Sequence, residues 1–205
     1  MIIVGDVHGN FKTLMALLEK TPKEQKICFV GDLIDRGPNS KQVLDFVLDN
    51  YHDCVLGNHE EMMIGSRSEW LKHGGLETTA SIGSPELINQ YAERIKRFPN
   101  YIIYDDIIKD GRKLLVCHAG LTKDNIEECI TTGFILYRVK SLPIFNYKEY
   151  FQVFGHLVND EVEITDYYAN IDTGCCFYNK RKLTALQFPE MIIYQQENID
   201  QEFYQ

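Results

Sequence analysis

The chain has 205 residues, of which 44% are hydrophobic and 25% are charged, so it can bury the core of one globular domain. Its formal net charge of −9 excludes a broad basic face for nucleic acid, and no apolar run approaches the ~20 residues needed to span a bilayer. The six cysteines show no spacing typical of a disulfide framework. We therefore expect a cytoplasmic protein with reduced cysteines and with neither nucleic-acid nor membrane partners.

The first third of the chain alternates short apolar runs with helical patterns. Residues 1–4, 26–30 and 53–56 are apolar or β-branched runs of the kind that form buried parallel strands. Residues 11–20 and 40–50 have helical periodicity, which predicts the order β-α-β-α-β. In such sheets, polar residues just past the strand ends meet at one edge and form the ligand site.

The middle of the chain has further helical patterns. We expect a helical insert over about residues 60–100, in which Gly74 and Gly75 end a turn of helix. Pro85 marks the start of a later helix that reaches Phe98, and its apolar residues recur at three- and four-residue intervals. This amphipathic helix is expected to pack against the sheet.

The second half of the chain turns to strands. Asp110-Gly111 is a strong hairpin signal between strands over 101–109 and 112–117. The other strand-like runs are 151–154, 163–171, 182–188 and 191–194. Residues 196–205 are polar enough to fray, and we expect a single domain over residues 1–205.

Carboxylate, amide and imidazole groups stand just past the ends of five apolar runs. These metal-ligand candidates are Asp6, His8, Asp32, Asn58, His118 and His156. A binuclear metal site needs one carboxylate that bridges two cations, with imidazole and oxygen ligands to complete each coordination shell. Asp32 is central in the sequence and is expected to be the bridge, with Asp6 and His8 on one metal and the other three residues on the second.

The charge of such a site favours a phosphate ligand. Two divalent ions, two ionised carboxylates and one hydroxide leave a net charge of about +1, which Arg36 and a second arginine would raise. Mixed imidazole and carboxylate ligation without thiolate indicates two manganese, iron or zinc ions. A hydroxide held between the metals would attack phosphorus, and His59, kept cationic by Asp35, would protonate the departing group.

The motif set resembles that of the metallophosphoesterases of the phosphoprotein phosphatase type, in particular the small bacterial and phage serine/threonine protein phosphatases. The likeness rests on Asp6-x-His8, Asp32-x-x-Asp35-Arg36-Gly37, Asn58-His59-Glu60, His118-Ala119-Gly120 and Gly155-His156, and extends to Trp70-Leu71-x-x-Gly74-Gly75, Ile171-Asp172-Thr173-Gly174-Cys175 and Lys182-Leu183-Thr184-Ala185-Leu186. The resemblance implies an α/β fold with a calcineurin-like β-sandwich flanked by α-helices, and Mn²⁺ or Fe as the working metal.

The resemblance also implies the same acid pair and phosphate-binding roles for Arg36, Asn58 and Arg138. The chain departs from the family pattern at two positions. Leu136 stands where an aromatic residue usually precedes the second arginine by two positions, and Leu157 replaces the threonine of the usual Gly-His-Thr.

We expect a metal-dependent phosphomonoester hydrolase, and foremost a serine/threonine protein phosphatase that also accepts phosphotyrosine. Its partners would be phosphorylated proteins or peptides, and the resemblance implies a monomer. The alternative is a symmetrical dinucleoside polyphosphate hydrolase acting on diadenosine tetraphosphate. Related symmetrical hydrolases often lack the second aspartate of Gly-Asp-x-x-Asp-Arg-Gly, so the presence of Asp35 favours the monoesterase. A non-catalytic scaffold of the same fold is a third reading, against which the complete ligand set argues.

Overall fold

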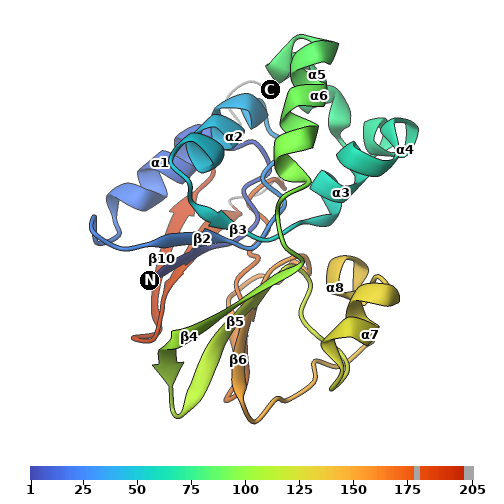
Figure 1. Ribbon diagram of the computed structural model, residues 1–205. Helices are drawn as coiled ribbons and strands as arrows, with labels where there is room; N and C mark the ends of the chain where they lie inside the picture. Colours follow the sequence, from blue (N-terminus) through green and yellow to red (C-terminus); the bar gives the residue numbers. More distant parts are fainter. Residues whose placement is uncertain (178–180, 201–205) are drawn as a thin grey trace.

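Two five-stranded mixed sheets pack on each other and are flanked by helices, in a computed structural model that describes residues 1–177 and 181–200 (Figure 1). The first sheet has the order β10-β9-β1-β2-β3, with β1, β2 and β3 parallel and β9 antiparallel to both of its neighbours. Its strands are β1 (Ile2–Val4), β2 (Ile27–Phe29), β3 (Asp53–Cys54), β9 (Lys182–Gln187) and β10 (Ile192–Glu197).

The second sheet has the order β4-β5-β6-β8-β7, in which β5, β6 and β8 are parallel and each edge strand is antiparallel to its neighbour. Its strands are β4 (Tyr101–Lys109), β5 (Arg112–Cys117), β6 (Tyr150–Phe154), β7 (Glu163–Ile164) and β8 (Tyr168–Asn170). Because both sheets contain parallel strands that end at the same side of the molecule, polar loops from the two sheets meet there.

Helices lie on the outer faces of the two sheets, as Figure 1 shows. In chain order the helices are α1 (Phe11–Glu19), α2 (Ser40–Asp49), α3 (Asn58–Gly65), α4 (Arg67–Lys72), α5 (Gly75–Ile82), α6 (Pro85–Ile95), α7 (Ile126–Thr131) and α8 (Phe134–Tyr137). Helices α1 and α2 lie over the first sheet, and α7 and α8 lie beside the second. The sandwich flanked by α-helices that the motif resemblance implied is confirmed.

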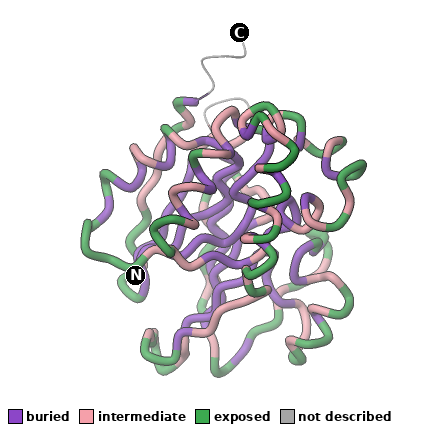
Figure 2. Tube along the Cα trace, turned by 45° about the horizontal axis from the view of Figure 1, so that its top comes forward, coloured by how far each residue is buried: buried purple, intermediate pink, exposed green. Residues whose placement is uncertain are grey.

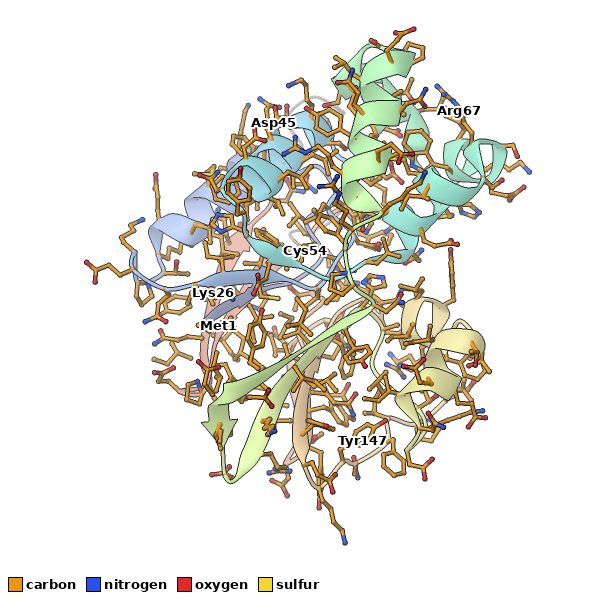
Figure 3. The ribbon with its side chains drawn as sticks, in the orientation of Figure 1. Met1, Lys26, Asp45, Cys54, Arg67 and Tyr147 are labelled. Atoms are coloured by element: carbon orange, nitrogen blue, oxygen red, sulfur yellow. The ribbon has the colours of Figure 1, made fainter. Side chains whose placement is uncertain are left out.

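The alternation of side chains along each strand divides the core into three layers. In β1, Ile2 and Val4 face the core beneath the helices, whereas Ile3 faces the layer between the sheets. In β5, Leu114 and Val116 enter the inter-sheet layer. The third layer lies under α7 and α8 and includes Tyr147, which is labelled in Figure 3. Figure 2 accordingly shows buried residues along the central strands and exposed residues in the outer loops and helix surfaces.

The predicted hairpin is confirmed. Strands β4 and β5 pair across Asp110 and Gly111, whose φ angles of 51° and 78° are those of a two-residue turn with both central residues left-handed. The expectation of one strand over 163–171 is wrong. Thr165 breaks it into β7 and β8, because its hydroxyl accepts hydrogen bonds from the backbone N–H groups of Tyr167 and Tyr168 and turns the chain back on itself.

Helix α6 buries its apolar face as its amphipathic pattern predicts, because Ile88, Tyr91 and Ile95 lie in the same core layer as Ile2 and Phe29 of the first sheet. It begins at Pro85 behind the Ser84 cap and contacts α3 and α5. The Tyr91 hydroxyl donates to Asp45 of α2, which lies next to α6 in Figure 3, and Arg94 donates to Asp49 at 2.7 Å.

The sequence analysis missed two short helices, and two of its expectations concern the chain as a whole. Helices α7 and α8 were not predicted, because each is shorter than two turns and has little periodicity. All six cysteines are free thiols. Within the described residues, no helix is long and apolar enough to cross a membrane.

Residues Asn198–Asp200, here called the C-terminal strap, are held against α1 instead of fraying. The buried carboxylate of Asp200 accepts hydrogen bonds from the backbone N–H groups of Lys12 and Thr13, at 3.2 and 2.9 Å. Asn198 donates to Asn10 at 2.9 Å, and Asn10 donates to the carbonyl of His8. The strap thus caps the N-terminus of α1 and supports the loop that follows β1. The rest of the expected frayed segment, 201–205, lies outside the described residues.

We predict that Asp200→Ala lowers the free energy of unfolding by about 1–3 kcal/mol, because it leaves buried helix N-terminal donors without an acceptor. Urea unfolding followed by circular dichroism measures this change. The control is Asp106→Ala, on the exposed side of β4, which should leave the free energy within ~0.5 kcal/mol of the parent. Equal stability of the two variants would show that the strap does not cap α1.

Candidate binuclear metal centre and active site

The predicted metal ligands converge from both sheets at the carboxyl ends of their strands. Each ligand follows a strand directly or begins the helix behind it. Asp6 and His8 follow β1, Asp32 follows β2, Asn58 begins α3 after β3, His118 follows β5 and His156 follows β6. The structure therefore brings together all six residues that the spacing of the motifs pointed to.

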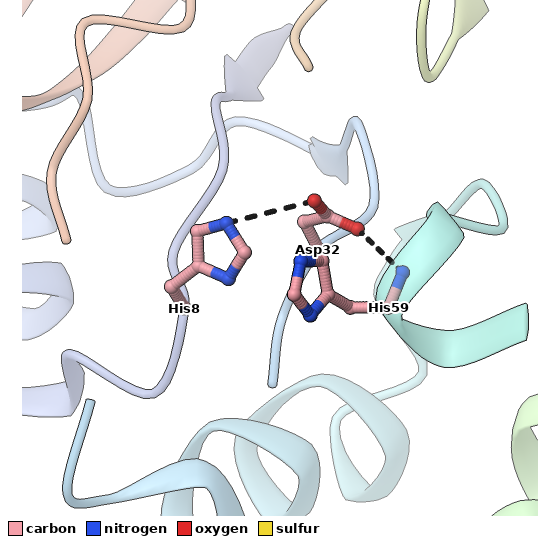
Figure 4. A group of neighbouring side chains, drawn as sticks. All are labelled: His8, Asp32 and His59. Carbon is pink, nitrogen blue, oxygen red and sulfur yellow. Dashed lines mark hydrogen bonds and ion pairs between the residues drawn. The ribbon is translucent and has the colours of Figure 1, made fainter. Parts of the chain in front are cut away.

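The Asp32 carboxylate lies between imidazoles of the two sheets. Its Oδ2 is 3.5 Å from Nε2 of His8, and its Oδ1 is 3.5 Å from Nε2 of His118. The backbone N–H of His59 donates to Oδ1 at 3.0 Å, which fixes the rotation of the carboxylate (Figure 4). Since each oxygen faces a different imidazole, Asp32 can serve as the bridging ligand that the sequence predicted.

Two groups of donor atoms within 4.8 Å of one another share Asp32. They are His8, Asp32 and His59, and Asp32, His118 and His156. The amide of Asn58 completes the second group, because its Oδ1 is 2.9 Å from Nε2 of His118 and 3.0 Å from Nδ1 of His156. Imidazole, carboxylate and amide oxygen donors without thiolate suit manganese, iron or zinc.

The backbone turns the free imidazole nitrogens toward the centre. Nδ1 of His8 contacts the carbonyl of Ile34 at 2.8 Å, and Nδ1 of His118 contacts the carbonyl of Val30 at 2.8 Å. A carbonyl can only accept, so Nδ1 carries the proton in both rings and Nε2 presents its lone pair to Asp32. Such a hydrogen bond on the far nitrogen is the usual support of a metal-ligating histidine.

The protonation of the cluster is that of a ligand set. Burial lowers the pKa of His8 and His118, and lowers that of His156 to about 3, so these rings are neutral near pH 7. Burial opposes ionisation of Asp32, but the imidazoles of His118, His59 and His8 hold its pKa below the ordinary value. Metal binding requires neutral imidazole and ionised carboxylate.

Two further carboxylates add negative charge to the same buried region. Asp6 accepts from the backbone N–H of His156, and its pKa is raised by burial and by the charges of Asp172 and Asp32. Burial also raises the pKa of Asp172 to about 6. Grouped buried carboxylates are unfavourable unless a cation compensates them, so the residues present fit the metal ions that the motifs predicted.

Asp35 and His59 form the expected pair inside the protein. Nδ1 of His59 lies 2.7 Å from Oδ2 of Asp35, and both side chains are almost fully buried. The Asp35 carboxylate also accepts from Nε1 of Trp70 at 2.9 Å and from the hydroxyl of Thr78 at 2.7 Å. Burial lowers the pKa of His59, but the charge of Asp32 and the hydrogen bond to Asp35 outweigh it, so the net pKa is raised.

The Arg36 guanidinium lies across the centre. Nη1 is 3.1 Å from Nε2 of His8, and Nη2 is 3.1 Å from Nε2 of His59. The ring of Phe177 stacks on its outer side at 5.1 Å, and Nη1 also donates to Sγ of Cys176 at 3.3 Å. A planar, permanently charged group held in this position suits a phosphate oxygen pair.

Arg138 is more constrained than a free phosphate clamp. Its Nε donates to the carbonyl of Ala119 at 2.6 Å and its Nη1 donates to the carbonyl of Leu142 at 2.9 Å, and the side chain packs over Phe154. Nη2 has no hydrogen-bond partner among the described residues. At most this one nitrogen is left for a ligand, so the phosphate-binding role predicted for Arg138 stays a prediction.

Comparison with known proteins decides the family. A family model for calcineurin-like phosphoesterases matches residues 1–191. The chain belongs to the calcineurin-like phosphoesterases. The family predicted from the motifs is therefore confirmed, and with it a metal-dependent hydrolase.

Relatives of this phosphoesterase carry a nucleotide-directed name. An asymmetrical bis(5′-nucleosyl)-tetraphosphatase PrpE from Anoxybacillus flavithermus is 31% identical, covering 92% of this chain and 90% of that protein. A protein of the same name from Bacillus cereus is 30% identical, covering 93% of this chain and 91% of its own. A serine/threonine phosphatase from Saccharomyces cerevisiae matches in fold, with a TM-score of 0.66, 16% identity, and coverage of 96% of this chain and 79% of that one.

Glu60 organises the phosphoesterase centre, although the motif analysis gave it no role. Its buried carboxylate accepts from the backbone N–H groups of Asp32 at 2.8 Å, Leu33 at 2.8 Å and Ile34 at 3.2 Å. It also accepts from Gly57 at the start of α3. One side chain thus ties the loop after β2 to the loop after β3. The signal that could have identified Glu60 is its position in the first turn of α3, two residues after the ligand Asn58.

The ligand loops of the phosphoesterase store backbone strain. Several non-glycine residues of the centre have left-handed φ angles, which side chains with a Cβ atom rarely adopt. These angles are 47° at His8, 50° at Asp32, 73° at Asp35, 66° at Arg36 and 69° at His156. Strain concentrated at one place is typical of functional sites, where surrounding contacts such as those of Glu60 maintain it.

Gly155 lets two ligand loops approach each other. A Cβ atom at this position would lie 1.9 Å from Oδ1 of Asp6, which no rearrangement short of moving the carboxylate would relieve. The glycine precedes His156, whose backbone N–H holds Asp6 in place. Glycine is therefore required here for close packing of two ligands.

We predict that Gly155→Ala lowers metal affinity by about 10- to 100-fold, because it displaces the Asp6 carboxylate. Metal content after dialysis against defined free Mn²⁺ measures the change. The matched control is Gly65→Ala in α3, where the nearest atom to an added Cβ is 3.7 Å away. If both variants bound Mn²⁺ as the parent does, Asp6 would not belong to the centre.

Proposed function

We propose that the chain is a metal-dependent hydrolase of dinucleoside polyphosphates that cleaves a phosphoanhydride bond at the centre around Asp32. The observation that carries the proposal is the arrangement of Arg36, whose guanidinium reaches both His8 and His59 above the shared Asp32 carboxylate. The nucleotide substrate is supported by relatives about 30% identical over nine-tenths of both chains. The nucleotide substrate replaces the phosphorylated protein that the motifs led us to expect.

The residues present would hold two metal ions, with Asp32 between them. Asp6 and His8 would complete one coordination shell, and Asn58, His118 and His156 the other. When bound, such ions neutralise phosphoryl charge and lower the pKa of coordinated water. We propose manganese as the working metal, with iron or zinc as alternatives of the same ligand chemistry.

Arg36 would bind and orient the reacting phosphate. Its two terminal nitrogens can contact two oxygens of one phosphate group, and Phe177 holds the guanidinium plane from the other side. In the reaction, water adds to phosphorus while one P–O–P bond breaks, and the departing nucleotide leaves as a phosphate anion. Fixed positive charge around the reacting group stabilises the charge that develops in the transition state.

His59 would move the proton. Asp35 accepts from Nδ1, and Nε2 faces the centre, where it accepts from the Arg36 guanidinium in this structure and would take up the transferable proton once Arg36 binds a phosphate instead. A histidine held cationic by a buried carboxylate can donate this proton to a departing oxygen. His59 also belongs to a group of possible metal-binding atoms, but its Nδ1 is already engaged by Asp35, so we assign it to proton transfer.

A protein phosphatase is the second candidate, and the Asp35–His59 pair is the observation that favours it. The alkoxide of a serine or threonine leaves only with a proton, whereas a departing phosphate is a much weaker base with a pKa of about 6. A buried acid pair is thus of most use for phosphomonoesters. Symmetrical hydrolases often lack the aspartate at this position, but the relatives of this chain are named asymmetrical, so Asp35 does not count against a dinucleotide substrate.

We predict that the Mn²⁺-loaded protein converts diadenosine tetraphosphate to ATP and AMP, and that a chelator abolishes this turnover. Ion-exchange chromatography of the products separates this outcome from symmetrical cleavage, which gives two ADP. A phosphoserine peptide is assayed in parallel. His118→Asn, purified in the same way, is the control, because loss of a metal ligand should remove the activity of the chain but not that of a contaminant.

Other results would reject the proposal. Dephosphorylation of the peptide with the dinucleotide untouched would make the chain a protein phosphatase. Silence towards both substrates, with metal bound, would favour the non-catalytic scaffold.

We predict that His59→Asn lowers kcat for phenyl phosphate by about 10²- to 10⁴-fold while Mn²⁺ content stays at the parent level. The loss should be smaller for p-nitrophenyl phosphate, because p-nitrophenolate is a weaker base and needs no proton to leave. The matched control is His52→Asn, because the His52 ring packs on Phe29 and Phe46. A fall in metal content, or equal losses with both esters, would contradict the assignment of His59 as proton donor.

A further inference from the structure

A cavity of about 160 Å³ lies beside the metal centre and has no role in the chemistry described above. Charged and polar side chains form much of its wall. They are Arg138, Lys140, Asn159, Glu163, Tyr168 and Asn170. The cavity is smaller than the 300–1,000 Å³ of pockets that enclose a whole drug-sized ligand, so it suits one part of a larger substrate.

The wall of the cavity is joined directly to a metal ligand. Leu157 lines the cavity and follows His156 in the chain. The Arg138 side chain lines the cavity, and its Nε donates to the carbonyl of Ala119, which follows the metal ligand His118 in the chain. A ligand in the cavity would therefore lie next to a group bound at the centre.

Two positively charged side chains line the cavity, and one of them, Arg138, is tied to Ala119 next to the ligand His118. The Nη2 atom of Arg138 is free among the described residues, because Nε and Nη1 are used by backbone carbonyls. Lys140 places its ammonium 3.2 Å from Oδ1 of Asn159, and the Lys140 side chain is exposed. Within residues 1–177 and 181–200 neither cation has a carboxylate at ion-pair distance, so both are available to a phosphate group.

The cavity wall also carries a carboxylate, which lies close to Lys140 because both contact the Asn159 amide. Glu163 comes from β7, the edge strand, which is separated from β6 and His156 by β8. Its carboxylate accepts from the Tyr168 hydroxyl at 2.8 Å and from Nδ2 of Asn159 at 3.3 Å, which holds it in position. A fixed carboxylate is the usual acceptor for ribose hydroxyls.

We infer that this cavity binds the second phosphate group of a nucleoside polyphosphate, with Arg138 and Lys140 on that phosphate and Glu163 on a hydroxyl of the attached ribose. The inference rests on the proposed nucleotide substrate and deepens it. Arg138 lies next to the loop that carries His118, whereas Lys140 and Glu163 lie together at the Asn159 amide, so a phosphate and its attached ribose could contact them side by side. The cavity is too small for the base, which would stay outside.

Calorimetric titration of the Mn²⁺-loaded protein tests this subsite with three ligands that resist hydrolysis or carry no bond to break: inorganic phosphate, imidodiphosphate and adenosine 5′-(α,β-methylene)diphosphate. For Lys140→Ala, we expect the Kd for imidodiphosphate to rise about tenfold and the Kd for phosphate to change less than ~twofold. For Glu163→Gln, we expect the Kd for the nucleotide to rise about threefold. The Kd for imidodiphosphate should not rise above that of the parent.

Lys113→Ala is the matched control, since this lysine pairs with Asp105 at the opposite end of β5 and should leave all three Kd values unchanged. A rise of the same factor for phosphate and imidodiphosphate in Lys140→Ala, or no rise for either, would overturn the subsite. These titrations need no turnover. A protein that bound the ligands as expected but left diadenosine tetraphosphate intact would contradict the proposed function and keep the subsite.

Discussion

The buried carboxylate of Asp32 contacts imidazoles from two different sheets, with one oxygen 3.5 Å from His8 and the other 3.5 Å from His118. Everything else in the centre depends on this shared anion. It requires the carboxyl ends of parallel strands in both sheets to meet, and that requirement explains why the two sheets pack as a sandwich with their ligand loops on one side. Without a compensating cation, so much buried negative charge would oppose folding, so metal binding and the stability of the loops are coupled.

A second set of contacts keeps this arrangement rigid. Glu60 accepts backbone N–H groups from two ligand loops, and Asp35 is held by Trp70 and Thr78 from the helical insert. These contacts maintain left-handed backbone at positions where it is unfavourable, including Asp32 and Asp35. A site preorganised in this way loses little free energy to rearrangement when a phosphate arrives, which is the condition for strong electrostatic stabilisation. The insert therefore serves the chemistry although it supplies no predicted ligand.

Most of the centre could be predicted from the sequence because each ligand directly follows an apolar run whose strand character is local information. The hairpin was predictable from its Asp110-Gly111 turn, and the family from the resemblance of the motif set. The partners of Asp35 beyond His59 could not be predicted, since Thr78 reaches it only through the packing of the insert. The contacts of α6 with α3 and α5 likewise depend on how the insert packs. Periodicity identifies a buried face but not what buries it.

The C-terminal strap has a consequence for the order of events during protein synthesis. The loop with Asp6 and His8 is synthesised long before Asp200. Asp200 contacts Thr13 in the helix behind that loop, and the two residues are 187 positions apart. Strand β1 likewise lacks one of its two neighbouring strands until β9 has been synthesised. A nascent chain therefore carries every motif of the first half without a finished loop to present them. Hydrolytic competence should arise abruptly as translation passes the strap, and not gradually with chain length.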